Sequence, residues 1–276
     1  MKENSQKISA ITAYDYSFAK IANDAEIDVI LVGDSGAMVM FGYETTSPAT
    51  MDEMLLMSKA VSRGSSNSLL VGDMPFMSYH ASVDDAIRNA GRFIKEGGMQ
   101  AVKIEGDRHV AKTIRAITKA NIPVMGHIGL QPQMAQSWDG YRVHGSNYSS
   151  AKQLIEDAHE LEQAGAFCIV LEMITEEVSK IISESLSIPT IGIGSGRYCD
   201  GQIIVLHDLL NLNDSLNPKF VKQYADLKTQ THKALSDYKD DINSNNFPNS
   251  NHSWSMESSE LKKLQKYLGL IKKNKL

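Results

Sequence analysis

The chain has 276 residues, of which 42% are hydrophobic and 22% charged, a balance typical of a folded globular protein rather than of a disordered or fibrous one. Its 28 basic and 33 acidic residues give a net charge of −5, which argues against nucleic acid or an anionic membrane as the main partner. No apolar run approaches the roughly 20 residues of a membrane span, and no signal-type apolar core follows Met1, so we expect a cytoplasmic protein. Cys168 and Cys199 are too few for a disulfide framework and are expected to be free thiols.

Short runs rich in Val and Ile recur along the chain, each followed by an amphipathic stretch, and this pattern predicts buried parallel strands joined by helices. The predicted strands are Ile8 to Tyr14, Val29 to Asp34, Ser68 to Asp73, Ala101 to Glu105, Pro123 to His127, Phe167 to Glu172, Pro189 to Gly194 and Ile203 to Leu206. Eight such units favour a closed (β/α)8 TIM barrel of the α/β class over residues 1–242. An open doubly wound sheet is the alternative, but its nucleotide-binding glycine pattern is absent from the turn at Tyr14.

Two segments interrupt this alternation. The stretch from Gln131 to Asn147 is a long loop, and in a compact domain such a loop is expected to cover a functional site. Residues 243–256 are rich in Asn and Ser and are predicted to be a linker to a basic amphipathic helix over residues 257–276. We expect this C-terminal helical extension to dock on an acidic barrel surface, of its own or of a neighbouring chain, the alternative being a solvated tail.

The residues that close the predicted strands are mostly acidic. Asp34, Asp73 and Glu105 end the second, third and fourth strands, and Lys103 stands two residues before Glu105. In a barrel of this kind the C-terminal strand ends form the active site, where three converging carboxylates would repel one another without a cation between them. Oxygen ligands favour Mg²⁺, and we predict that Asp34, Asp73 and Glu105 bind it. The alternative is that each acid caps the helix that follows it.

Three further residues are candidates for binding or proton transfer. Glu172 ends an otherwise apolar strand, where burial would raise its pKa toward the range of a general acid or base, although a salt bridge at the strand end is the alternative. His127 could donate a hydrogen bond to substrate or orient another group, and a hydrogen-bonded core histidine is as plausible. Ser35 lacks the surroundings of a nucleophilic serine and is expected to bind a substrate carboxylate.

The sequence contains, in this order, the strings Ile11-Thr-Ala-Tyr-Asp-Tyr, Val32-Gly-Asp-Ser, Gly72-Asp-Met-Pro-Phe-Met, Val102-Lys-Ile-Glu-Gly, Gly126-His-Ile-Gly-Leu, Gly140-Tyr-Arg-Val, Val170-Leu-Glu, Gly192-Ile-Gly-Ser-Gly, Asp200-Gly-Gln and Pro218-Lys-Phe-Val-Lys. Taken together, these strings resemble the ketopantoate hydroxymethyltransferase (3-methyl-2-oxobutanoate hydroxymethyltransferase) family. One such string would be weak, whereas so many in order over nine tenths of the chain are specific.

The resemblance implies a folate-dependent enzyme of pantothenate biosynthesis. Its expected reaction moves a one-carbon unit from 5,10-methylenetetrahydrofolate to 3-methyl-2-oxobutanoate through a Mg²⁺-stabilised enolate, giving 2-dehydropantoate. By the same resemblance, Mg²⁺ is placed on Asp34, Asp73 and Glu105, the last through water, and proton transfer on Glu172. The oxoacid is placed against Asp34, Ser35, Asp73 and Lys103.

The sequence departs from the family pattern in a few places. Gly36-Ala37-Met38 follows the Gly-Asp-Ser string where the family usually has a different turn, Glu44 stands where Asp is commoner, and Gln131 replaces the usual Thr. We expect the resemblance to end near residue 255. The resemblance also implies a homo-oligomer, which in this family is a decamer.

Two other classes compete with this assignment. The phosphoenolpyruvate mutase and isocitrate lyase group also consists of Mg²⁺-dependent barrels that act on oxoacid enolates, but it would require a catalytic cysteine in a Lys-Lys-Cys-Gly type of loop, and neither cysteine stands in one. The second competing class is a sensor, a non-catalytic barrel that binds an oxoacid or folate.

Overall fold

The computed structural model describes residues 1–134, 142–213 and 218–273. By internal contacts the chain divides into two units, Met1–Ala225 and Asp226–Leu276. The first unit therefore ends before the residue 242 that the sequence suggested. The helix after Ala225, α9 (Leu227–Asn243), belongs to the second unit. None of its residues is buried, so it does not contribute to a barrel core.

The first unit is built on a closed barrel of parallel strands, in which each strand pairs with the next one along the chain and β8 pairs with β1. The strands are β1 (Ile8–Thr12), β2 (Val29–Val32), β3 (Leu69–Asp73), β4 (Ala101–Glu105), β5 (Val124–Gly129), β6 (Cys168–Glu172), β7 (Thr190–Ile193) and β8 (Gly201–Ile204). The predicted (β/α)8 barrel is confirmed, and β4 has the predicted bounds.

The eighth strand is the one whose predicted position was wrong. It begins at Gly201 and ends at Ile204, whereas the sequence suggested Ile203 to Leu206. Gly201 and Gln202 pair with Ile191 and Gly192 of β7, although neither fits an apolar strand pattern. Leu206 instead begins a short helix, α8 (Leu206–Leu209).

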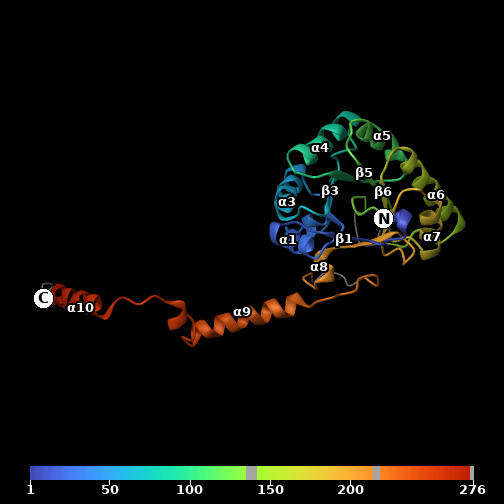
Figure 1. Ribbon diagram of the computed structural model, residues 1–276. Coiled ribbons are helices and arrows are strands. Elements are labelled where there is room, and N and C mark those ends of the chain that lie inside the picture. Colours follow the sequence, from blue (N-terminus) through green and yellow to red (C-terminus); the bar gives the residue numbers. More distant parts are fainter. Residues whose placement is uncertain (135–141, 214–217, 274–276) are drawn as a thin grey trace. The chain divides into compact units, whose positions relative to one another are not determined.

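Helices surround the barrel on its outside, as Figure 1 shows for α1, α3, α4, α5, α6 and α7. Their bounds, with those of the short α2, are α1 (Tyr16–Asp24), α2 (Gly36–Val39), α3 (Met51–Gly64), α4 (Val83–Lys95), α5 (Ala111–Lys119), α6 (Tyr148–Gln163) and α7 (Glu176–Ser185). Single turns of 3₁₀ helix lie at η1 (Lys2–Asn4) and η2 (Arg108–Val110). Side-chain caps begin the longer helices, as where Ser82 Oγ accepts a hydrogen bond from Asp85 N at 3.1 Å at the start of α4.

Alternation along the strands produces two separate apolar cores. Ile30 and Ile104 face outward and pack with the helices, whereas Leu31, Val71 and Ala101 face inward and pack inside the barrel. Residues two positions further along the inward-facing series therefore also point into the barrel. Asp73, Lys103, Glu105, His127 and Glu172 belong to this inward series, whereas Asp34 lies beyond the end of β2 and outside it.

The second unit contains α9, the single turn η4 (Ser250–His252) and α10 (Ser258–Lys273). The predicted C-terminal helix is confirmed. On α10, the side chains of Leu261, Leu264 and Leu268 are exposed, and the side chain of Ile271, the fourth residue of the predicted apolar face, lies outside the described side chains. The docking of this helix stays a prediction. No helix in the described parts of the chain is long and apolar enough to cross a membrane.

Candidate active site

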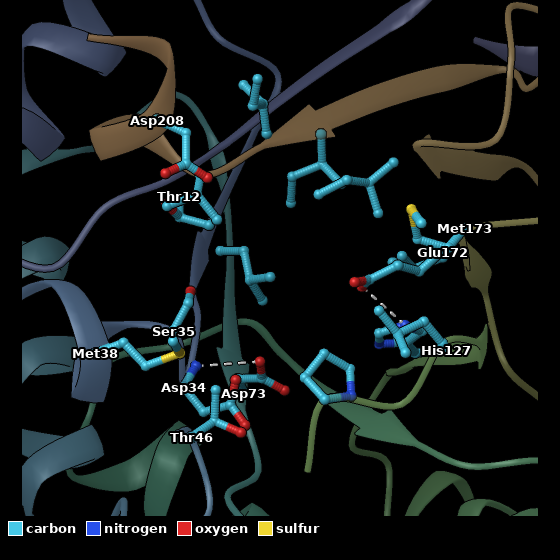
Figure 2. A pocket seen from close by; sticks show the side chains of 18 of the residues that line it. Thr12, Asp34, Ser35, Met38, Thr46, Asp73, His127, Glu172, Met173 and Asp208 are labelled. Carbon is cyan, nitrogen blue, oxygen red and sulfur yellow. Dashed lines mark hydrogen bonds and ion pairs between the residues drawn. The ribbon is translucent and has the colours of Figure 1, made fainter. Parts of the chain in front are cut away.

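A cavity of about 470 Å³ opens at the C-terminal ends of the barrel strands. It contains every candidate that the sequence named, and Figure 2 shows several of them pointing into it from different strands. The candidates on its wall are Asp34, Ser35, Asp73, Lys103, Glu105, His127 and Glu172. The structure thus brings the predicted site residues together around one cavity, in the barrel lumen rather than in the helix layer.

Asp73 and Lys103 form a buried ion pair on neighbouring strands. The β3 to β4 register places the two residues side by side, and Lys103 Nζ lies 2.7 Å from Asp73 Oδ1. Their side chains are 2% and 6% exposed. Burial alone would lower the pKa of Lys103, but the charges of Asp73 and Glu105 outweigh burial and raise it. Lys103 is therefore a fixed positive charge inside the cavity.

Asp34 lies just beyond the end of β2 and contacts the same pair. Its backbone N–H donates a hydrogen bond to Asp73 Oδ2 at 3.2 Å. Burial and the negative charge of Asp73 raise the pKa of Asp34 to about 7, although Lys103 opposes this shift. In the described structure, the carboxyl groups of Asp34 and Asp73 thus both interact with the charge of Lys103.

Glu105 is held by Gln133, a residue that the sequence interpretation missed. The backbone N–H of Gln133 donates to Glu105 Oε1 at 2.9 Å, and its side-chain Nε2 donates to Asp34 Oδ2 and to the carbonyl oxygen of Met74, both at 3.0 Å. Tyr79 completes the contact by donating its hydroxyl to Gln133 Oε1 at 2.7 Å. Gln133 belongs to the loop predicted to cover a functional site. Its place in that loop is the sequence feature that could have identified it.

Only part of that loop is described. Residues 135–141, including the Trp138, Gly140 and Tyr141 of the predicted cover, lie outside the described residues. Before them, Gln133 is buried, and Pro132 lines the cavity. The described beginning of the loop therefore forms part of the cavity wall.

His127 lies between two carboxylates. Its Nε2 atom is 3.2 Å from Glu172 Oε2 (Figure 2), and its Nδ1 atom is 3.7 Å from Glu105 Oε2. Neither contact has hydrogen-bond geometry, so both ring nitrogens are buried without a hydrogen-bond partner in the described structure. His127 is therefore not a hydrogen-bonded core histidine, and its position suits a residue that orients Glu172 or contacts a ligand.

Ser35 and Glu172 occupy the edges of the polar group. Ser35 Oγ lies 2.9 Å from the Tyr14 hydroxyl, which gives the serine a buried partner. Glu172 ends β6 and is paired in register with Gly129 of β5. A Cβ on residue 129 would lie 2.1 Å from the carbonyl oxygen of Glu172, and the φ of Gly129, +99°, suits glycine. A larger residue at this position would therefore displace the backbone at Glu172.

The donor chemistry of the site fits Mg²⁺. If Asp34, Asp73 and Glu105 are all ionised, Lys103 leaves two negative charges uncompensated among buried groups, and a hard dication would balance them. Within the described parts of the chain, no three His, Cys, Asp or Glu side chains are arranged to hold an ion on their own. Mg²⁺ usually takes one or two protein carboxylates and keeps several waters, a requirement that Asp34 and Asp73 can meet. Glu105, engaged by Gln133, suits an outer position.

The two cysteines lie away from this chemistry. Both are free and buried, as expected, and neither lines the cavity. Burial raises the pKa of Cys168 to about 12, so its thiol stays protonated and unreactive near neutral pH.

The chain matches the family model described as ketopantoate hydroxymethyltransferase over residues 1–250. It belongs to the ketopantoate hydroxymethyltransferase family. A relative from Nitrosopumilus maritimus (strain SCM1), named 3-methyl-2-oxobutanoate hydroxymethyltransferase, is 54% identical over 269 residues, covering 98% of this chain and 96% of the relative. A relative of the same name from Clostridium botulinum (strain 657 / Type Ba4) is 53% identical, covering 96% of each chain.

The likeness to the ketopantoate hydroxymethyltransferase family extends further along the chain than expected. The family model ends at residue 250, but the alignment with the Nitrosopumilus relative leaves too few unmatched residues for the likeness to stop near residue 255. The expectation therefore agrees with the family model but not with the alignment to this relative. Part of α10 therefore has a counterpart in at least this relative.

Solved structures of other families share the fold of this ketopantoate hydroxymethyltransferase family member. Phosphoenolpyruvate phosphomutase from Streptomyces platensis subsp. rosaceus aligns with a TM-score of 0.59 at 13% identity, covering 98% of this chain and 94% of its own. Phosphonopyruvate hydrolase aligns with a TM-score of 0.60 at 11% identity, covering 97% and 93%. At such identities the likeness concerns the fold alone, while the close sequence relatives are hydroxymethyltransferases.

Proposed function

We propose that this protein transfers a hydroxymethyl group from 5,10-methylenetetrahydrofolate to 3-methyl-2-oxobutanoate and so produces 2-dehydropantoate. The observation that carries the proposal is the 54% identity with a named 3-methyl-2-oxobutanoate hydroxymethyltransferase over nearly the whole of both chains. The buried cavity with Lys103, Asp73 and Glu172 supports it, because the chemistry needs a cation beside a ketone and a base beside C3.

The overall reaction balances with water as the third reactant. The carbon–hydrogen bond at C3 of the oxoacid breaks, and a carbon–carbon bond forms between C3 and the methylene carbon. The two carbon–nitrogen bonds of the methylene bridge break, and the oxygen of water becomes the new hydroxyl group. The two folate nitrogens take up two protons, one originating at C3 and one from water.

Mg²⁺ would be held by Asp34 and Asp73 and, when bound, would supply Lewis-acid polarisation of the ketone and carboxylate of the oxoacid. Lys103 adds a fixed positive charge beside the oxygen on which negative charge develops as the C3 proton leaves. Ser35 contributes a hydroxyl to the substrate carboxylate. Glu105, positioned by Gln133, lies next to this group, and burial raises the pKa of its carboxyl well above the usual value.

Glu172 is the residue that we assign to proton transfer at C3. It lies across the cavity from Asp34 and Ser35 (Figure 2), so a substrate held on that side would present its carbon chain to Glu172. His127, 3.2 Å away, limits the positions that the carboxylate can take. A base must lie within hydrogen-bond reach of the proton it removes, and this arrangement allows it.

The function is tested by a turnover assay with both substrates, with and without Mg²⁺, and by exchange of the C3 proton of 3-methyl-2-oxobutanoate into deuterated water. We expect turnover and exchange that both require Mg²⁺, and Glu172→Gln should abolish exchange. Glu177→Gln, a change at an exposed acid outside the cavity, is the matched control. Retained exchange in Glu172→Gln would remove it as the base, and exchange without any product on adding the folate would favour the sensor.

We also place this protein in the cytoplasm, on the basis of its proposed metabolic role. We also propose a homo-oligomer, with the family's decamer as the expected assembly. Light scattering after size-exclusion chromatography measures the subunit number directly, and a monomeric mass would contradict the oligomer.

A further inference from the structure

The steps proposed for the oxoacid involve only some of the residues that line the cavity. The ion pair of Lys103 and Asp73 lies in its polar part. Part of the remaining wall is apolar and comes from the ends of β6, β7 and β8 and from the segment near Phe220. It includes Met173, Ile193, Ile203, Val205 and Phe220. A five-carbon oxoacid is too small to occupy both parts of a cavity of about 470 Å³, so the apolar part is free for a second, flatter molecule.

One acidic residue faces this cavity without a role in the steps above. Asp208 lies on α8, directly after β8, and is half-buried in the cavity wall. In Figure 2, Asp208 and Thr12 lie at the opposite end of the cavity from Asp34 and Asp73, with Ser35 between them. Asp208 is therefore separate from the group that would hold Mg²⁺.

The carboxylate of Asp208 is poorly satisfied. Within the described structure, its one side-chain hydrogen bond is a long contact of 3.5 Å from Asn213 Nδ2 to Oδ1. Burial raises the pKa of Asp208, which reflects this shortage of donors. A half-buried carboxylate with a free acceptor edge can bind a ligand that presents two adjacent N–H groups, as an amidine-like edge does.

We propose that Asp208 binds the 2-amino-4-oxopyrimidine edge of the reduced pterin, while the apolar wall formed by Ile203, Val205 and Phe220 packs against the faces of the ring. This inference rests on the proposed function, because that function supplies the folate. The pterin carries a ring N3–H and a 2-amino group side by side, and these two donors match the two oxygens of a carboxylate. Flat heterocycles bury their faces well against branched aliphatic and aromatic side chains.

The placement has a consequence for the reaction. With its pterin ring at the Asp208 end, the donor would extend its methylene carbon toward the part of the cavity where Glu172 and Asp73, the partner of Lys103, lie. The oxoacid and the folate would then occupy different residues of one cavity. Removing the Asp208 carboxylate should weaken folate binding and leave the oxoacid chemistry intact.

The test measures binding of tetrahydrofolate and of its 2-desamino analogue by calorimetry, to the wild type and to Asp208→Ala and Asp208→Asn. The wild type is expected to bind tetrahydrofolate about 10- to 100-fold more tightly than the analogue, because a hydrogen bond to a charged acceptor is lost. Asp208→Ala should lose this preference, and Asp208→Asn, which keeps one acceptor, should fall between. Asp24→Asn, a change at an exposed acid on α1, is the matched control and should keep the wild-type preference.

Exchange of the C3 proton, which needs no folate, reports on folding and on the oxoacid site of each variant. We expect exchange in Asp208→Ala to stay within about threefold of the wild type. An unchanged preference for tetrahydrofolate in Asp208→Ala, or an equal loss of exchange, would overturn the role of Asp208 while the wild-type turnover still supports the function. If the wild type neither binds tetrahydrofolate nor turns over, the proposed function fails, and this inference fails with it.

Discussion

Lys103 Nζ lies 2.7 Å from Asp73 Oδ1, and the two side chains are almost completely buried on adjacent strands of the barrel. The pair follows directly from the β3 to β4 register, which places the two residues beside each other. Asp34 and Glu105 line the same cavity, and burial raises the pKa of both carboxyls. Lys103 is thus the cation through which this group of carboxylates is partly neutralised.

Replacement of Lys103 by Met should damage both stability and activity. Breaking a buried ion pair by removing one partner typically costs about 3–5 kcal/mol of the free energy of unfolding, because the other charge is left uncompensated. Loss of the charge beside the developing oxyanion should lower kcat/KM by about 100-fold or more. Urea unfolding and steady-state kinetics measure the two effects. Lys95→Met, at an exposed lysine on α4, is the control, and a kcat/KM within threefold of wild type in Lys103→Met would contradict the role.

Replacement of Gln133 by Leu should disturb the site from the loop side. The variant keeps the size of the side chain but loses the bonds to Asp34 and to the Met74 carbonyl, leaving buried polar groups unpaired. We expect a loss of about 1–3 kcal/mol in the free energy of unfolding and a higher KM for the oxoacid, because Asp34 is no longer fixed. Tyr79→Phe removes a single donor to Gln133 and should show a smaller effect in the same direction. A Gln133→Leu protein with wild-type stability and KM would show that these bonds do not matter.

Gly72 keeps space for the packing beneath Asp73. A Cβ at this position would lie 2.3 Å from Phe93 Cδ1 of α4. Gly72→Ala should therefore destabilise the protein by about 1–3 kcal/mol and reduce activity through displacement of Asp73. In the double variant Gly72→Ala/Phe93→Leu, the leucine that replaces Phe93 is smaller and should restore part of the lost stability. Thermal unfolding measures this effect.

A second glycine provides the control for this prediction. Gly91, also on α4, has open space around the position of a Cβ. Gly91→Ala is expected to raise stability by about 0.5–1 kcal/mol, because alanine reduces the entropy of the unfolded chain. If Gly72→Ala behaved like Gly91→Ala, the steric argument about Phe93 would be wrong.

Glu162 gives a pH-dependent contribution to stability. Its Oε1 atom on α6 accepts hydrogen bonds from Ser187 N and Oγ, both at 2.7 Å, and from Ile188 N at 3.2 Å. Burial raises the pKa of Glu162, but these donors outweigh burial and lower it below the usual value. A lowered pKa in the folded state means that the stabilisation is present above the unfolded pKa of about 4.3 and is lost as the pH falls through the folded value.

The variant Glu162→Gln should therefore be less stable than wild type by about 1 kcal/mol at pH 7, and the difference should shrink toward pH 3.5. Urea unfolding at the two pH values measures it. Glu160→Gln, at an exposed position on the same helix, should show no such pH dependence. A difference between Glu162→Gln and wild type that is equal at both pH values would rule out an effect of the carboxylate charge.

The alternation of apolar residues in the sequence was sufficient to determine the barrel, because strand periodicity and the polar residue that ends each strand are local properties of the chain. Asp34, Asp73, Glu105 and Glu172 could be named for this reason. The sequence could not decide whether Lys103 and Glu105 face the lumen or the helices. That choice depends on which alternating face closes inward, and barrel closure involves all eight strands.

Only the tertiary structure revealed the contacts that cross from one element to another. Gln133 reaches Asp34 across 99 positions of sequence, and Asp208 lines the same cavity as residues at the far ends of other strands. The position of His127 between Glu105 and Glu172 likewise depends on the register of β4, β5 and β6. The sequence by itself determined the fold and named most of the acidic residues that line the cavity. Their distances, partners and shared cavity were decided by strand register and loop path, which no local pattern encodes.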